Sequence, residues 1–71
     1  MKRSITPRGF KLIEFTDLYG VECSLQESSL HTPMCVWLGP DNNRMHLDQA
    51  TAQQIVDELT VFIKTGYLAE Q

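Results

Sequence analysis

The sequence predicts an α+β domain in which an antiparallel sheet of about four strands precedes one C-terminal amphipathic helix packed on one sheet face. Two observations carry this prediction. Apolar and polar residues alternate in the first part of the chain, which is the period of a strand with one buried side. From Ala52 to Ile63 the apolar residues recur every three or four positions, the period of a helix. We place a single domain over residues 1–71, because so short a chain has room for one core.

The first hairpin is expected from Phe10–Asp17 and Val21–Glu27, which are rich in β-forming residues. Between them, Asp17 and Gly20 occupy the first and fourth positions of a type I turn that closes with a left-handed glycine. A one-residue slip of this register would expose the apolar residues to water. The pairs predicted on the apolar side are Phe15 with Cys23 and Ile13 with Leu25.

A second hairpin is expected after a connecting loop over Ser28–Pro33. Met34–Leu38 is a continuous apolar run, and the turn-forming residues 39–43 follow it. Arg44–Leu47 then forms a short fourth strand. The sheet thus covers residues 10–47, and residues 1–9 are expected to be a loose N-terminal arm.

The helix is expected over residues 48–66, including its caps. The Asp48 carboxylate can accept hydrogen bonds from the free amides of the first turn. Gly66 can adopt the left-handed conformation that ends a helix. The apolar stripe should pack on the sheet; its members are Ala52, Ile55, Val56, Leu59, Phe62 and Ile63.

The composition disfavours several classes of function. A net charge of −3 argues against nucleic acid, because binding phosphates needs a concentrated basic face. The sequence has no signal peptide and no membrane span, so we expect a cytoplasmic protein without a membrane partner. Cys23 and Cys35 have no zinc spacing and are expected to be free thiols. We expect no metal and no cofactor.

The sheet face opposite the helix is where function is expected. One helix shields one face, so the other must be polar or covered by something outside the chain. Trp, Arg and His suit recognition, because an indole offers a large apolar surface and a guanidinium can clamp a carboxylate or phosphate. If Met34, Val36, Leu38, Met45 and Leu47 face the helix, the residues on this opposite face are Leu12, Cys35, Trp37, Arg44 and His46.

Three interpretations of Trp37 stay open. It could close a small second core with Leu12 and Leu30, leaving Arg44 and His46 in water. It could form a homo-oligomer interface, since small domains gain stability by association. It could also bind a ligand or partner. An enzyme is not expected and no catalytic residue is assigned, because neither cysteine has an identifiable orienting base.

Several short segments carry a resemblance to other proteins: Cys23–Ser29, Trp37–Gly39 and Arg44–Leu47, with the preceding Phe15–Gly20 and the end of the closing helix, Thr65–Leu68. Together they make residues 12–68 resemble a group of small accessory proteins encoded in phage and prophage genomes. Other members often have a longer insert between the segments Trp37–Gly39 and Arg44–Leu47, where this chain has only Pro40–Asn43. The group has no settled activity, so the resemblance assigns no functional residue. It implies a setting in which small phage proteins bind host components stoichiometrically, including immune enzymes and their nucleotide signals.

From these observations we expect a non-enzymatic, homo-oligomeric binding protein in the cytoplasm of an infected bacterial host. It would block a host defence component, either a host protein or a small nucleotide signal. Trp37 would stack on the target, Arg44 would meet a negative group and His46 would supply a hydrogen bond. Arg8 and Lys11 could add positive charge. The alternative is a homo-oligomeric structural or regulatory module that has no small-molecule ligand.

Overall fold

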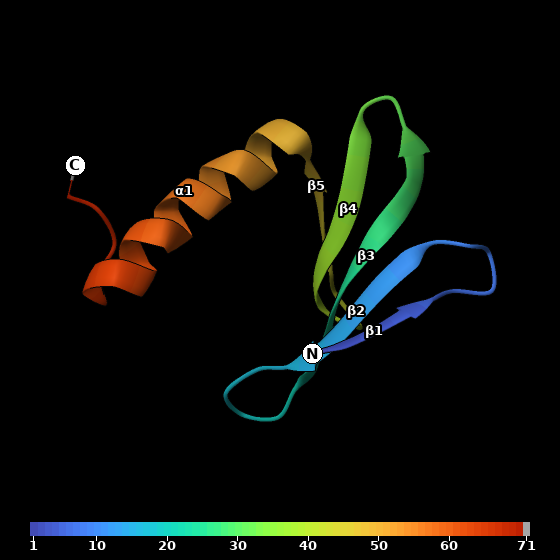
Figure 1. Cartoon of the computed structure of the whole chain (residues 1–71), viewed down its shortest axis with the longest axis horizontal. Helices are drawn as coiled ribbons and strands as arrows, with labels where there is room; N and C mark the ends of the chain where they lie inside the picture. Colours follow the sequence, from blue (N-terminus) through green and yellow to red (C-terminus); the bar gives the residue numbers. More distant parts are fainter. Residues whose placement is uncertain (71) are drawn as a thin grey trace.

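The computed structural model describes residues 1–70 and contains one antiparallel sheet followed by one helix (Figure 1). The predicted α+β class is confirmed. The sheet has five strands, where about four were expected, and each strand pairs with its neighbour in the chain. The elements are β1 (Lys2–Ile5), β2 (Lys11–Thr16), β3 (Glu22–His31), β4 (Met34–Pro40), β5 (Met45–Asp48) and α1 (Gln49–Thr65).

The additional strand is β1, which forms where a loose arm was expected. It pairs antiparallel with β2, with Ser4 opposite Leu12. In the turn between these strands, the amide of Gly9 donates a hydrogen bond to the carbonyl of Thr6 at 2.8 Å. The arm prediction was wrong because β1 is exposed along its whole length, so its sequence carries no apolar alternation. Backbone pairing at the sheet edge orders it instead.

The hairpin of β2 and β3 has the predicted register. Phe15 lies opposite Cys23, and Ile13 lies opposite Leu25. The Asp17 carboxylate closes the turn, accepting hydrogen bonds from the amides two and four residues later at 2.8 and 3.0 Å. This hairpin was predictable from the sequence because the turn residues and the apolar–polar alternation indicate the same register.

The segment Ser28–Pro33 was expected to be a loop, and this was wrong for most of it. Strand β3 continues to His31, and only Thr32 and Pro33 form the turn to β4. The register between β3 and β4 shifts between Glu27 and His31. A polar strand end with an irregular register lacks the period-2 pattern that would identify it.

The helix α1 begins and ends where the sequence predicts. The Asp48 side chain accepts a hydrogen bond from the Thr51 amide at 2.8 Å. That hydrogen bond holds the pKa of the Asp48 carboxyl below its usual value. At the other end, Gly66 has a φ of 81° and donates its amide to the carbonyl of Phe62 at 2.7 Å.

The predicted packing of α1 on the sheet was wrong. Figure 1 shows the helix projecting away from the strands, and within residues 1–70 its main contacts are with β5 alone. No residue of α1 is buried. The reason is the connection: β5 ends at Asp48 and α1 starts at Gln49, so no loop residue is left to reverse the chain. Turns from strand to helix commonly use about 2–6 residues.

The sheet consequently has two different open faces, which we name by their central residues. The Trp37 face carries Leu12, Ser24, Gln26, Ser28, Trp37 and His46, with Arg44 beside them. The Leu25 face carries Ile13, Phe15, Leu25, Val36, Leu38, Met45 and Leu47. Pairing assigns these sides, because residues directly opposite in antiparallel strands point the same way. Among hydrophobic residues of the described chain, only Cys23 and Leu47 are buried.

Candidate functional site

A row of four side chains crosses the Trp37 face from β2 to β5. Leu12 lies opposite Gln26, Gln26 opposite Trp37, and Trp37 opposite His46. Cross-strand partners on one face lie about 5 Å apart, so their side chains can touch. The register therefore places Leu12, Trp37 and His46 on the same face, as the alternation predicts.

The indole of Trp37 and the imidazole of His46 are stacked. Their ring centroids are 4.0 Å apart and their planes differ by 17°. The Nε2 atom of His46 lies 2.9 Å from the hydroxyl of Ser28, which is buried. Ser28 also accepts a hydrogen bond from the amide of Leu30 at 3.1 Å. The stack is thus anchored to β3, and His46 covers one side of the indole.

Arg44 reaches across the strands toward the same indole. Its Nη1 atom donates hydrogen bonds to the side-chain amide oxygen Oε1 of Gln26 at 2.8 Å and to the Ser24 hydroxyl at 3.3 Å. Its guanidinium carbon lies 5.8 Å from the centre of the Trp37 ring, a cation–π distance. Both hydrogen-bond acceptors are neutral. Neither acceptor neutralises the guanidinium charge, and the acidic residues Glu14 and Asp41 line the same hollow as Arg44.

Gly39 provides the space that this arrangement needs. It lies opposite Ser24 on β4, and its φ is 137°, in the region that favours glycine. A β-carbon at Gly39 would lie 3.4 Å from the Cα of Arg44. Glycine therefore lets the backbone of Arg44 approach β4 closely, and no side chain stands between the guanidinium and Ser24.

A hollow of about 480 Å³ adjoins Trp37, between β3, β4 and the turn that joins β1 to β2. Arg8 lines it from that turn, with its guanidinium carbon 5.8 Å from the centre of the Phe10 ring. The turn is held by the amide of Phe10, which donates to the Thr6 hydroxyl at 3.0 Å. Arg8, predicted to add charge, therefore lies at the hollow that borders the indole.

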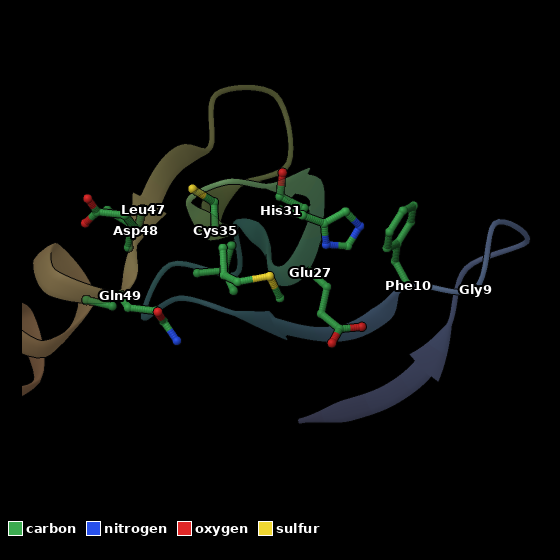
Figure 2. A pocket seen from close by; sticks show the side chains of 12 residues that line it. Gly9, Phe10, Glu27, His31, Cys35, Leu47, Asp48 and Gln49 are labelled. Atoms are coloured by element: carbon green, nitrogen blue, oxygen red, sulfur yellow. The ribbon is translucent and has the colours of Figure 1, made fainter.

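Two predicted site residues are not part of this cluster. Lys11 alternates with Leu12 along β2, so its side chain lies on the Leu25 face. Cys35 lines a different hollow of about 430 Å³, which has His31 and Phe10 at one end and Asp48 at the other (Figure 2). Its thiol lies 3.4 Å from the Pro33 carbonyl.

The small core expected in one alternative, formed by Trp37, Leu12 and Leu30, is not what the structure contains. Leu30 is 44% exposed and does not line the hollow beside Trp37. Trp37 and Leu12 are half-buried on the same face. The difference arises because residues 28–31 are strand rather than loop. Their backbone follows β3 and does not fold back over the indole.

Sequence reasoning missed the residues that hold the cluster: Ser24, Gln26 and Ser28. The alternation places Ser24 and Gln26 on the polar side of the first hairpin, so a signal for both was present. Their partners were not predictable, because the register between β3 and β4 shifts between Glu27 and His31, and the alternation does not show that shift. Ser28 was missed because it was assigned to a loop, where no strand face could be predicted for it.

Two potential nucleophiles, Cys23 and Ser28, lie in surroundings that restrict their reactivity. Burial, together with the carboxylates of Asp17 and Asp41, raises the pKa of the Cys23 thiol above its ordinary value. A thiol with a raised pKa is a poor nucleophile at neutral pH. Ser28 lies beside an imidazole, but its side chain is buried at 7% exposure.

Comparisons with protein-family models, curated proteins and solved structures find no match to this chain. Within residues 1–70, no three His, Cys, Asp or Glu side chains gather in a way that could hold a metal ion. Over the same range, no helix has the length and apolar character needed to cross a membrane. The site is therefore interpreted from its own geometry.

Proposed function

We propose that this chain is a non-enzymatic binding protein that holds a planar, negatively charged ligand of the nucleotide class on its Trp37 face. The observation that carries the proposal is an indole stacked on His46, with the Arg44 guanidinium 5.8 Å from its centre and Arg8 lining the adjoining hollow. A base could stack on the remaining indole surface, since base–aromatic stacking contributes about 1–3 kcal/mol. The guanidinium groups would meet phosphate oxygens, and a fork of N–H donors matches that geometry.

The resemblance to phage and prophage proteins suggests what such binding would accomplish. A small protein that sequesters a nucleotide signal, or that blocks a protein responding to it, would interrupt a host defence pathway by stoichiometry alone. The weak activation of Cys23 and the burial of Ser28 support binding without turnover. The site of action would be the cytoplasm of the infected bacterium.

Trp37 is the sole tryptophan of the chain, so its fluorescence reports directly on the proposed site. Cyclic mono- and dinucleotides would be titrated by calorimetry and by fluorescence quenching. We expect a ligand that quenches Trp37 and whose affinity falls about 5- to 150-fold in Trp37→Ala, the equivalent of one lost stack. Arg44→Ala should weaken binding more than Arg44→Lys, which keeps the charge but loses the fork.

Lys64→Ala is the matched control for the charge change, because Lys64 lies in the last turn of α1, away from the cluster. It should leave the affinity unchanged. Binding heat that survives both Trp37→Ala and Arg44→Ala would remove the assigned site.

A second candidate is a homo-oligomeric module whose Trp37 face contacts another copy without any ligand. The half-buried indole beside a hollow supports it, because aromatic side chains are enriched at the centres of interfaces. Sedimentation of Trp37→Glu tests it. An oligomer that becomes a monomer in this variant, with no response to nucleotides in the wild type, would favour the module over the ligand-binding protein.

A further inference from the structure

The centre of the Leu25 face is apolar and has no cover within residues 1–70, while the charged residues Arg3, Lys11 and Glu27 lie toward its β1 side. Its central residues Ile13, Leu25 and Leu38 are only half-buried, and Met45 is 50% exposed. A hollow of about 500 Å³ opens among side chains that include Ile5, Ile13, Leu25 and Val36. A face of this kind needs a second layer, because a domain buries its apolar sheet side against another element.

The apolar stripe of α1 is equally uncovered. Val56, Leu59 and Phe62 are 54%, 48% and 48% exposed, and Ile63 is 78% exposed. An isolated helix of 17 residues is marginal in water, and most helices are stabilised by packing one face. The same chain thus has a sheet face that no helix covers and a helix stripe that no sheet covers.

The chain cannot bring these two surfaces together by folding back. Asp48 is both the last residue of β5 and the N-cap of α1, so the strand passes directly into the helix. In proteins that exchange elements between copies, short connections of this kind direct an element outward to a second molecule. The projecting helix in Figure 1 has that arrangement.

The accessible surface area of the chain is larger than that of a compact monomer of the same mass. The chain exposes 6021 Å², whereas a folded monomer of 8.1 kDa exposes roughly 4,500 Å². The excess is about 1,500 Å² per chain, or about 3,000 Å² for two, within the range of obligate homodimer interfaces. The radius of gyration, 13.7 Å, exceeds the roughly 11 Å of a compact chain of this length.

We propose that two copies of this chain exchange their helices, so that α1 of each copy packs across the Leu25 face of the other. The lengths agree: 17 residues of helix span about 25 Å, and five strands are about 19 Å wide. The interface is self-complementary, as two-fold symmetry requires. This proposal is independent of the proposed nucleotide site, which would lie on the opposite side of the sheet.

The charge pattern of α1 favours a protein partner over a lipid surface. Helices that lie on membranes carry Lys and Arg on the polar side. Here the polar side has Asp57 and Glu58, with Gln53 and Gln54, and an anionic lipid surface would repel it. A second copy supplies an apolar sheet face instead.

Sedimentation of the wild-type chain over micromolar to millimolar concentrations should give twice the chain mass. Leu59→Asp, on the helix stripe, should halve the mass and expose the Leu25 face. Gln54→Asp, on the polar side of the same helix, should remain dimeric. A wild type that is monomeric throughout this range would overturn the proposal.

A mixing experiment separates helix exchange from other dimers. Leu25→Asp disables the sheet face, and Leu59→Asp disables the helix, so each variant alone should be monomeric. Mixed together, they retain one intact helix and one intact face that match, and a heterodimer should form. A dimer held by helix–helix contacts would show no such rescue, because every mixed pair would contain a damaged helix. Circular dichroism confirms that both variants keep their strands.

The connection provides a test that does not rely on a damaged interface. A flexible Gly/Ser insertion of about six residues between Leu47 and Asp48 should let α1 reach its own sheet. The variant should then be a stable monomer with helix content equal to that of the wild type. An inserted chain that remains dimeric would contradict the exchange. Nucleotide binding on the Trp37 face should persist in this variant, so the two proposals fail separately.

Discussion

The two faces of the sheet are built from the same strands but satisfy their side chains in different ways. On the Trp37 face, buried Ser24 and Ser28 hold Arg44 and His46 by hydrogen bonds within the sheet. That face is complete without a covering layer. On the Leu25 face, apolar side chains have no such partners and remain half exposed. A polar network can be closed within one sheet, whereas hydrophobic burial needs a second layer.

The largest difference between the faces should appear on truncation at their centres. In the assembled protein, Leu25→Ala should lower the free energy of unfolding by about 2–5 kcal/mol, because it leaves a cavity under the covering helix. Gln26→Ala, the next residue on β3 and on the other face, should cost about 1 kcal/mol. Chemical denaturation measures both. Equal, small losses of stability in the two variants would show that the Leu25 face stays exposed to solvent and would contradict the difference between the faces.

Gly39→Ala should be the next largest effect, and it should act on the Trp37 face. A non-glycine residue at a φ of 137° costs about 1–3 kcal/mol, and the new β-carbon would press on the backbone of Arg44. We expect a lower melting temperature and a weakened ligand response. Gly20→Ala is the control, since Gly20 also has a positive φ but has nothing within 4 Å. If both variants lose ligand binding alike, the approach of Arg44 is not what Gly39 provides.

Ser28→Ala tests the anchor of the aromatic stack. The change leaves the amide of Leu30 and the imidazole of His46 without their shared partner, at a cost of about 1 kcal/mol. The freed imidazole should alter the fluorescence of Trp37, measured by emission wavelength and lifetime. Ser29→Ala, at the exposed neighbour, should leave the stability unchanged. An unaltered Trp37 signal in Ser28→Ala would mean that stacking alone orients His46.

The smallest effect concerns the start of α1 and depends on pH. The pKa of Asp48 is lower in the folded protein than in the unfolded chain, where it is about 3.9. The ionised carboxylate therefore stabilises the folded protein at pH values above that unfolded pKa, and this stabilisation is lost as the pH falls through the folded pKa. Helix content measured by circular dichroism should therefore decrease at acidic pH. Asp48→Asn caps the helix without titrating and should remove that part of the decrease. An identical acid profile in the two proteins would exclude Asp48 as its cause.

Local chemistry accounts for what could be predicted along the chain. Asp17 and Gly20 dictated a turn, and that turn set the pairing of Phe15 with Cys23. The caps Asp48 and Gly66 defined the helix between them. Each of these features depends on residues only a few positions apart, so pattern and propensity suffice to find them.

Long-range geometry accounts for what could not be predicted. The exposed edge strand β1 forms because its backbone pairs with that of β2. Its side chains show no alternation that would predict this pairing. The partners of Arg44 and His46 depend on how β3 aligns with β4, and the register shift between Glu27 and His31 changes the alignment that the turn at Thr32 and Pro33 would otherwise set. The helix stripe identified an apolar surface correctly, but the direct junction at Asp48 directed it away from its own sheet. Amphipathic sequence specifies that a surface must be covered; the path of the backbone determines which surface can cover it.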